Sequence, residues 1–485
     1  MMSRRNLLTA GVAAGMSMPL ARQGSAQASR ARALGARLPT TRLGGREVVL
    51  TARPHHVVLE PGGRATPAWL FDARPFPVLR IRRGETATVT LRNALTQHTS
   101  IHWHGVRVPN AMDGVPYLTQ SPVQPGERFT YRFAPPDAGT YFFHPHCNTS
   151  EQLGRGLLGA LIVEDEHRAP FDDDLVMILK DWNLGPDGSF TPFLTMAGAS
   201  RAGTFGALRT VNGLPSPRLD VAAGADLRLR LINADCTRIC AIGVEGAESA
   251  VVAIDGNPVA PFALDGWRLG PGMRVDLALR TPPTGVVRLV DDFAATPVVL
   301  AALAVRGAPL PRGDFQPPAL AAPGIVAPDL ANARTHRLEL GAGVVAANLP
   351  DLQPIVLPDG RRLDLADSLC LGSATLWTLD GQSWPERDHR RLPPPLFSFD
   401  RGQSVVLEIF NATSHAHPLH LHGHTLTILS ASRLKRPVHR ADTVLVMPNE
   451  RVQAAFVADQ PGNWMIHCHI VEHQETGMMG WFRVS

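Results

Sequence analysis

A spaced pattern of glycine and asparagine occurs three times in this chain and constrains its fold more than any other feature. In each copy a glycine stands nine residues before an asparagine, with a β-branched and apolar run between them, at 84–93, 224–233 and 402–411. Each copy is followed by a Pro-Gly or Pro-Asn turn whose second residue stands 13 residues before another glycine, at 126–139, 272–285 and 449–462. Apolar runs bounded by such turns are typical of short β-strands. Three copies with the same internal offsets predict three related β-domains.

The composition agrees with this division. The chain has 485 residues, which is too many for one ordinary hydrophobic core. Its 43 glycines and 42 prolines suit many turns between short strands. We therefore predict an all-β protein of Greek-key sandwiches or barrels. The domains are expected near residues 29–166, 167–312 and 336–485, with a linker rich in proline and alanine over 313–335.

The first 28 residues have the composition of an export signal. Paired arginines at positions 4 and 5 precede an apolar run over 7–20, and an Ala-Gln-Ala cleavage site stands at 26–28. The paired arginines predict export through the twin-arginine pathway, to the periplasm or otherwise out of the cytoplasm. No other stretch is long and apolar enough to span a bilayer, so we expect no transmembrane anchor in the mature chain.

Without this segment the chain is almost neutral. The formal net charge is +4, and the segment has three arginines and no acidic residue, so +4 minus 3 leaves +1. The sequence also has no basic stripe with interleaved aromatic residues, which argues against binding to nucleic acid.

The histidines are confined to particular copies of the repeat. None lies between His167 and His336, whereas the first and third copies are each followed by clusters that contain H-x-H pairs: His102 and His104, His144 and His146, His420 and His422, and His467 and His469. Alternate side chains of a strand share one face, so the members of each pair point the same way. Eight imidazoles can then converge across one interface of the outer domains, with the middle domain as a spacer. Imidazole suits copper, whereas Ca²⁺ and Mg²⁺ prefer oxygen.

Strand parity separates a second site from this cluster. Cys468 must point away from the histidines on either side of it, and His417 is an odd number of residues from the H-x-H pair that follows. A turn can bring His473, five residues after Cys468, beside them. Two imidazoles and a thiolate form the trigonal ligand set of a blue-copper centre, and Met478 can supply the weak axial contact. Core packing is the alternative for Met478, although its neighbour Met479 fits that role better.

These motifs resemble the copper motifs of three-domain multicopper oxidases, such as laccases and periplasmic copper oxidases. The strings HWHG, HPH, HPLHLHGH and HCHIVEHQETGM occur in the family's order, and the similarity extends from about residue 40 to the C-terminus. It implies three cupredoxin-like domains, of which the second has no copper ligands, and four coppers per chain. By motif position, the type 1 copper would be held by His417, Cys468, His473 and Met478, the type 2 copper by His102 and His420, and the type 3 pair by His104, His144, His146, His422, His467 and His469.

Two further positions bear on proton supply in the family. Asp113 matches an aspartate that lies near the cluster and assists proton delivery, although a turn residue before Gly114 is the alternative. Several bacterial members have glutamate directly after the last type 1 histidine, where this chain has Gln474, which cannot donate a carboxyl proton. Proton delivery would then rely on Asp113, Glu472 or water.

The resemblance implies an enzyme that takes single electrons from a donor and reduces O₂ to water. Laccase-like oxidation of phenols or aromatic amines is the preferred hypothesis. Oxidation of Cu(I) or another metal ion for copper tolerance is the alternative, but the eight methionines beyond residue 28 are scattered. A non-enzymatic envelope scaffold is disfavoured, because all ten histidine ligands and Cys468 are intact.

The sequence leaves the cysteine pairing and the oligomeric state open. If Cys468 binds metal, four cysteines are left, and they can pair into two disulfides in three ways: Cys147, Cys236, Cys240 and Cys370. An oxidising compartment permits such disulfides.

Overall fold

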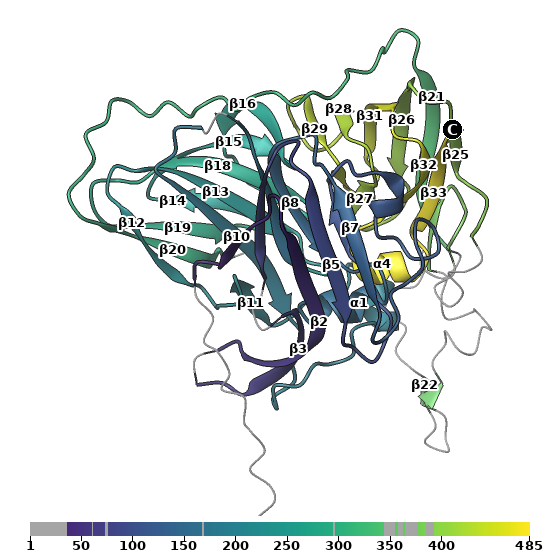
Figure 1. The fold of residues 1–485 in the computed structure, drawn as a ribbon, viewed down its shortest axis with the longest axis horizontal. Helices are drawn as coiled ribbons and strands as arrows, with labels where there is room; N and C mark the ends of the chain where they lie inside the picture. The colour runs from purple at the N-terminus through teal and green to yellow at the C-terminus, as the bar shows by residue number, and fades with distance from the viewer. Residues whose placement is uncertain are drawn as a thin grey trace, which may run out of the picture.

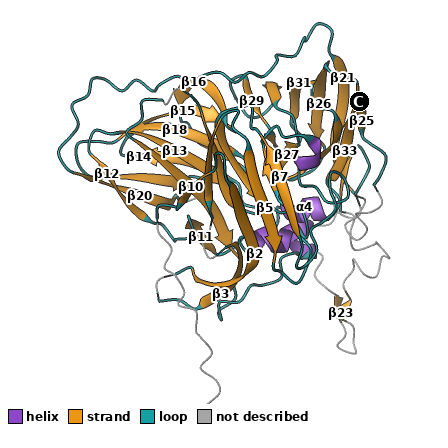
Figure 2. Ribbon diagram, in the orientation of Figure 1, coloured by secondary structure: helices purple, strands orange, loops and turns teal. Residues whose placement is uncertain are grey.

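The computed structural model describes residues 36–60, 62–72, 76–166, 169–293, 296–343, 355–356, 362–363, 376–384 and 392–485. The export signal and Cys370 lie outside these residues, so what was predicted for them stays a prediction. The chain forms two-layer β-structures with very few helices, and this confirms the predicted all-β class (Figure 2). The strands that follow the N-terminus lie centrally in Figure 1, those of the middle third lie to the left, and those of the last third lie to the right.

Two sheets with a common core make up the first of these structures. The smaller sheet contains, in order, β3 (Ala65–Phe71), β2 (Glu47–Val58), β5 (Ala87–Asn93) and β7 (Arg128–Phe133). The larger contains β1 (Thr40–Arg42), β4 (Val78–Arg82), β9 (Gly159–Glu164), β8 (Gly139–His144) and β6 (His102–His104). Leu91 of β5 and Leu161 of β9 lie in one hydrophobic cluster, so the two sheets pack face to face.

The middle structure repeats this plan. Its six-stranded sheet contains β11 (Leu208–Val211), β10 (Asp173–Trp182), β13 (Asp226–Asn233), β18 (Arg274–Arg280), β15 (Glu248–Ile254) and β16 (Asn257–Ala263). Its five-stranded sheet contains β12 (Arg218–Ala222), β20 (Val298–Arg306), β19 (Val286–Asp291), β14 (Cys240–Glu245) and β17 (Trp267–Leu269). Residues 307–333, which include most of the predicted linker, contain no strand. The predicted domain boundaries themselves stay a prediction.

The last structure again pairs a six-stranded with a five-stranded sheet. The first contains β24 (Trp377–Leu379), β21 (Arg334–Ala342), β26 (Gln403–Asn411), β31 (Arg451–Ala458), β28 (Leu426–Ala431) and β29 (His439–Ala441). The second contains β25 (Phe397–Phe399), β33 (Met479–Val484), β32 (Gly462–Cys468), β27 (His417–Leu421) and β30 (Thr443–Val446). The short elements outside these sheets are β22 (Ile355–Val356), β23 (Arg362–Leu363), η1 (Asn110–Met112), α1 (Thr149–Gly154), α2 (Met196–Ala199) and α4 (Val471–Glu475).

The repeated asparagine joins a strand to a turn in all three structures. Asn93, Asn233 and Asn411 end β5, β13 and β26, and all three are buried. Each side-chain amide donates to two backbone carbonyls over 2.7–3.0 Å, and each side-chain oxygen accepts from the backbone two residues later. The backbone carbonyl of each asparagine accepts from the second residue of the repeated turn: Gly126, Gly272 or Asn449. A buried amide needs such partners, so the sequence repeat has a structural cause.

The first and middle structures touch backbone to backbone at Gly139 and Gly256. A Cβ atom on Gly139 would lie 2.5 Å from the carbonyl oxygen of Gly256 and 2.8 Å from its Cα. Gly139 opens β8, and the other end of this strand carries His144. The missing side chain therefore sets the spacing of the two structures beside a strand with a candidate ligand.

We expect Gly139→Ala to lower the free energy of unfolding by about 1–3 kcal/mol, because the added methyl group meets backbone that cannot yield without separating the two structures. Calorimetric melting temperatures measure the effect. Gly313→Ala is the matched control, since a Cβ atom there has no neighbour within 4 Å. Equal melting temperatures for the two variants would contradict this account of the contact.

Candidate metal centre

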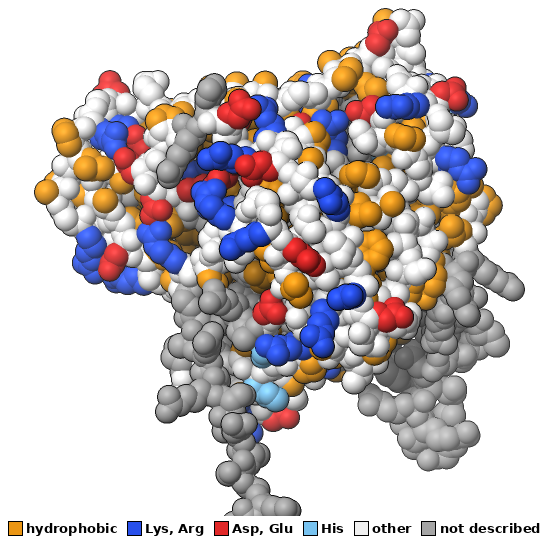
Figure 3. All heavy atoms as spheres, in the orientation of Figure 1, with side chains coloured by type: hydrophobic (Ala, Val, Ile, Leu, Met, Phe, Trp, Pro, Cys, Tyr) orange, Lys and Arg blue, Asp and Glu red, His pale blue; other side chains and the backbone are white. Residues whose placement is uncertain are grey.

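Strand pairing brings the eight histidines of the H-x-H pairs together. His102 of β6 lies opposite His144 of β8, and His420 of β27 lies opposite His467 of β32. All eight rings are buried. Rings of the first and last structures interleave, with centroids as close as 3.7 Å for His104 and His420. On the face drawn in Figure 3 the charged side chains of both signs are intermingled and histidine is scarce, as burial of the cluster requires.

The ring nitrogens approach one another closely enough to share metal ions. The Nε2 atoms of His422 and His467 are 3.1 Å apart, and those of His144 and His469 are 3.4 Å apart. Three sets of rings have nitrogens within 4.8 Å of one another: His102, His104 and His144; His102, His146 and His422; and His420, His422 and His467. Because these sets share members, the rings form one continuous cluster that can hold more than one ion.

Backbone carbonyls fix the outward nitrogen of several rings. Nδ1 of His102 donates to the carbonyl of Asp113 over 2.8 Å, and Nδ1 of His420 donates to the carbonyl of Asp442 over 3.0 Å. The rings of His144 and His467 also donate from Nδ1, each to the backbone carbonyl of the next residue in the chain. A ring that donates from Nδ1 presents the lone pair of Nε2 to the cluster, which is the form that binds metal.

His104 is held the other way round. Its Nε2 lies 3.1 Å from Oδ1 of Asp442 and 3.1 Å from Oγ1 of Thr443, so its Nδ1 is the nitrogen left over. The strand pattern predicts which face the ring takes, but it does not predict which nitrogen faces the cluster.

Five buried ring nitrogens in the cluster have no hydrogen-bond partner among the described residues: Nε2 of His102, His146 and His420, and Nδ1 of His104 and His469. A buried polar atom without a partner costs about 1–3 kcal/mol, and folded proteins retain few of them. Several such nitrogens in one place fit a site for metal ions that prefer nitrogen.

Burial also keeps seven of the eight rings neutral. Removal from water, followed by the neighbouring imidazoles, lowers the pKa of His144, His146, His422 and His469 well below the usual value. The pKa values of His104, His420 and His467 are lowered as well. At neutral pH the cluster therefore presents lone pairs rather than protons.

Cys468 lies behind the cluster, between His417 and His473. Its Sγ is 3.5 Å from Nδ1 of His417 and 3.8 Å from Nδ1 of His473, and all three residues are fully buried. Nε2 of His417 bonds to the Thr413 hydroxyl over 2.8 Å, and Nε2 of His473 donates to the carbonyl of Arg201 over 2.5 Å. Both Nδ1 atoms are therefore left facing the sulfur, as strand parity predicts for Cys468 and His417.

The two methionines that follow occupy different surroundings. Met478 is fully buried in the same hydrophobic cluster as Cys468, and its carbonyl accepts from the Cys468 backbone over 3.0 Å. Met479 packs in a separate small cluster with Met465 and Trp481. Burial raises the pKa of the Cys468 thiol, so a cation must replace its proton for the thiolate to form.

A segment of the middle structure, residues 195–204, covers the outer side of His473. The Glu472 carboxylate accepts from the backbone of Thr195 over 3.3 Å and from the Thr204 hydroxyl over 2.9 Å. Trp377 donates from Nε1 to the carbonyl of Ala199 over 2.7 Å. Glu472, one of the residues considered for proton delivery, thus has its carboxylate turned to this segment.

Asp113 contacts ligand candidates from both ends of the chain. Its Oδ2 accepts from Nδ1 of His422 over 2.9 Å, and its Oδ1 lies 3.3 Å from Nδ1 of His102. The residue also caps the C-terminal end of η1, so the turn position that was the alternative coexists with the contacts to the cluster. Gln474 is buried on α4.

Sequence reasoning missed two residues beside the cluster, Arg274 and Asp442. Arg274 of β18 binds both carboxylate oxygens of Asp442, one of which contacts His104. A Cβ atom on Gly272 would also lie 2.7 Å from the ring of His469. The middle structure, which was predicted to be a spacer without ligands, therefore contacts the cluster directly. Strand β18 contains three charged residues, Arg274, Asp276 and Arg280, so no feature of the sequence singled out Arg274.

The described cysteines form no disulfide with one another: Cys147, Cys236, Cys240 and Cys468 are free. Cys147 is buried, and its Sγ lies 3.9 Å from the Ser100 hydroxyl. Although Cys147 adjoins His146, it is a buried thiol that pairs with none of the other described cysteines.

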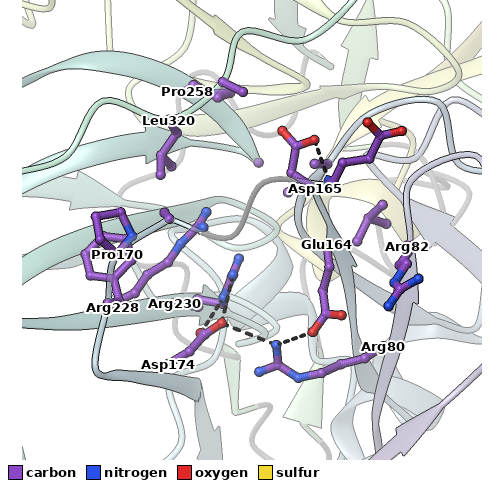
Figure 4. Close-up of a pocket in the computed structure, with 18 of the residues that line it drawn as sticks. Arg80, Arg82, Glu164, Asp165, Pro170, Asp174, Arg228, Arg230, Pro258 and Leu320 are labelled. Atoms are coloured by element: carbon purple, nitrogen blue, oxygen red, sulfur yellow. Dashed lines mark hydrogen bonds and ion pairs between the residues drawn. The ribbon is translucent and has the colours of Figure 1, made fainter.

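A large cavity lies away from both histidine sites. It has a volume of about 940 Å³ and lies between strands of the first and middle structures (Figure 4). Arg80 contacts Glu164 at 3.3 Å and Asp174 at 3.2 Å, and Arg230 binds both oxygens of Asp174. These charges neutralise one another in pairs, so cavity size does not indicate where the chemistry takes place.

Comparison with known proteins identifies the family. Sequence profiles of the multicopper oxidase family match residues 56–168, 173–286 and 372–485. Multicopper oxidase MmcO of Mycobacterium tuberculosis is 30% identical over 522 aligned residues, which cover 98% of this chain and 95% of that protein. This chain belongs to the multicopper oxidase family. The resemblance inferred from the four motifs is confirmed.

Other relatives of this multicopper oxidase agree with the assignment. Laccase-1 of Botryotinia fuckeliana is 26% identical, with 87% of this chain and 79% of that protein covered. The crystal structure of a multicopper oxidase from Pseudomonas thermotolerans matches with a TM-score of 0.79 and 36% identity, covering 92% of this chain and 100% of the other. The chain is therefore an oxidoreductase of a family that uses copper, a reducing substrate and O₂ as acceptor. Within its described residues, no helix has the length and apolar character needed to cross a membrane.

The metal-free oxidase should lose stability as the pH falls from 7 to 5. Because the buried rings have pKa values below the ordinary 6.5, the unfolded chain binds more protons than the folded one below pH 6.5. Stability is therefore fully present above pH 6.5 and is lost below it, by up to about 1.4 kcal/mol per pH unit for each ring.

Urea unfolding of the metal-free protein at several pH values measures this slope. His146→Gln should reduce the slope, whereas His56→Gln, a change at an exposed histidine, is the matched control and should leave it unchanged. A free energy of unfolding that does not change between pH 7 and 5 would refute the account of the neutral cluster.

Proposed function

We propose that this oxidase removes single electrons from a small organic donor at the Cys468 site and reduces O₂ to water at the histidine cluster, with four coppers per chain. The observation that carries the proposal is the adjacency of the two sites. The cluster has eight buried imidazoles with unpartnered nitrogens, and Cys468 stands in the chain between two of them, His467 and His469.

The assignment of each copper follows the motif positions. The type 1 copper is assigned to His417, Cys468, His473 and Met478, the type 2 copper to His102 and His420, and the type 3 pair to His104, His144, His146, His422, His467 and His469. Copper held there would supply the electron transfer, in which four one-electron oxidations of the donor balance O₂ plus four protons giving two waters. The backbone on either side of Cys468 offers a short bonded route from the sulfur to rings of the cluster.

The segment that covers His473, residues 195–204, indicates which class of electron donor the enzyme oxidises. The carbonyl that accepts from Nε2 of His473 belongs to Arg201, which is exposed, so one hydrogen bond and one residue separate the ring from the surface. Residues 195–204 contain a single methionine, Met196, whereas a Cu(I) site needs several soft sulfur ligands. These features, together with the laccase among the relatives, favour phenols or aromatic amines over metal ions.

We assign proton delivery to Asp113, whose carboxylate oxygens lie within 3.3 Å of His102 and His422. Gln474 cannot donate a carboxyl proton. The carboxylate of Glu472 accepts hydrogen bonds from Thr195 and Thr204 in the segment that covers His473. We also propose that the enzyme acts outside the cytoplasm, and the paired arginines and the Ala-Gln-Ala site of residues 1–28 support export by the twin-arginine pathway.

Purified copper-loaded protein should contain four coppers per chain, absorb as a blue thiolate centre and consume O₂ with a phenolic dye. Cys468→Ser should abolish the blue band and oxidase activity, because serine cannot supply the thiolate. Cys147→Ser is the matched control, since that buried cysteine is no candidate ligand, and it should keep both properties. Oxidase activity retained in full by Cys468→Ser would overturn the assignment of electron entry.

The donor class is tested by comparing kcat/KM for a phenol, an aromatic amine and Cu(I) in the same preparation. We expect the organic donors to have the larger values. A value for Cu(I) about tenfold or more above those for the organic donors would reverse the choice and assign the enzyme to metal-ion oxidation.

A further inference from the structure

Arg274 lies at the junction of the three structures. Its side chain projects from β18 of the middle structure and is fully buried. Nε donates to the carbonyl of Thr140 in the first structure over 3.2 Å. The two terminal nitrogens donate to the two oxygens of Asp442 in the last structure over 2.7 and 2.5 Å. One guanidinium therefore ties together segments that are 134 and 168 residues from it in sequence.

The pairing with Asp442 is bidentate. A planar guanidinium presents two parallel N–H groups to a carboxylate, which an ammonium group cannot do. The carboxylate is thus fixed in position.

Asp442 contacts two candidate copper ligands. Its Oδ1 lies 3.1 Å from Nε2 of His104, and its backbone carbonyl accepts from Nδ1 of His420 over 3.0 Å. The Thr443 hydroxyl donates to the same Oδ1 over 2.9 Å and lies 3.1 Å from Nε2 of His104. These contacts leave Nδ1 of His104 and Nε2 of His420 as the nitrogens without partners.

The packing leaves this pair no freedom to shift. A Cβ atom on Gly105, the residue after His104, would lie 2.4 Å from both NH2 of Arg274 and Oδ2 of Asp442. On the other side Asp255 accepts from the Arg274 backbone over 2.8 Å and from the Thr443 backbone over 3.0 Å. The glycine of the HWHG motif is therefore required by the close approach of a salt bridge as well as by its own φ of 81°.

We propose that Arg274 is a positioning residue for the copper assigned to His102 and His420. By fixing Asp442, it sets the ring of His420 and the orientation of the neighbouring His104, one from each outer structure. This inference rests on the proposed function. It gives the middle structure, which has no candidate ligand in its described residues, a direct part in assembling the copper cluster.

The test compares Arg274→Lys with Arg230→Lys in copper-loaded protein. Arg230 is the matched control because it is also buried and also bridges two structures, through Asp174, Asp276 and the Thr140 hydroxyl, but contacts no ring of the cluster. Lysine keeps the charge at both positions and loses the bidentate pairing. The readouts are copper per chain, the paramagnetic-resonance signal of type 2 copper and the blue absorption of the Cys468 site.

We expect Arg274→Lys to fall from about four coppers per chain to about three and to lose at least about half of the type 2 signal, with the blue absorption retained. Arg230→Lys should keep the copper and the type 2 spectrum, even if its melting temperature falls as far. Four coppers and an unaltered type 2 spectrum in Arg274→Lys would overturn the inference.

If Arg274→Lys does not fold, Asp442→Asn tests the inference in its place. This variant keeps the shape of the side chain and removes the charge that Arg274 binds. Loss of type 2 copper from that variant supports the inference, and a type 2 spectrum like that of the unmodified protein overturns it. Unmodified protein that binds no copper would instead overturn the proposed function, so the two failures are distinguishable.

Discussion

The packing of eight imidazoles into one buried interface is the constraint on which the rest of this structure depends. Each ring nitrogen that is removed from water needs a partner. Burial disfavours protonation of the rings, as the lowered pKa values of His144, His146 and His469 show. Carbonyls and carboxylates satisfy the outward nitrogens, while several inward nitrogens are left without a partner in the described residues. Metal ions that prefer nitrogen satisfy such lone pairs, and this need accounts for the histidine pairs at the ends of strands in the first and last structures.

The middle structure takes part in both sites although none of the candidate ligands belongs to it. Arg274 fixes Asp442 beside His104, and the carbonyl of Arg201 accepts from His473 on the other side of Cys468. The Glu472 carboxylate accepts hydrogen bonds from Thr195 and Thr204, on either side of Arg201, and so holds this segment in place. The geometry of each site is thus set by contacts across interfaces with the middle structure, so a local change in that structure can alter the geometry of both sites.

The sequence predicted those features that depend on local periodicity. Alternation along strands placed the H-x-H pairs on one face and Cys468 on the other. The same nine-residue offset from a glycine to Asn93, Asn233 and Asn411 revealed three related β-structures. Arg274 and the cover over His473 were missed, because their contacts join residues far apart in sequence with no repeated spacing. The sequence also could not predict which nitrogen of each histidine ring faces the cluster, because tertiary packing sets the hydrogen-bond partner of each ring.

Anomalous X-ray scattering from crystals of the copper-loaded enzyme, recorded at the copper absorption edge, tests the central claim most directly. The account predicts four peaks, one beside the sulfur of Cys468 and three among the eight imidazoles of the cluster. Peaks elsewhere, or none within the cluster in protein that contains copper, would contradict it.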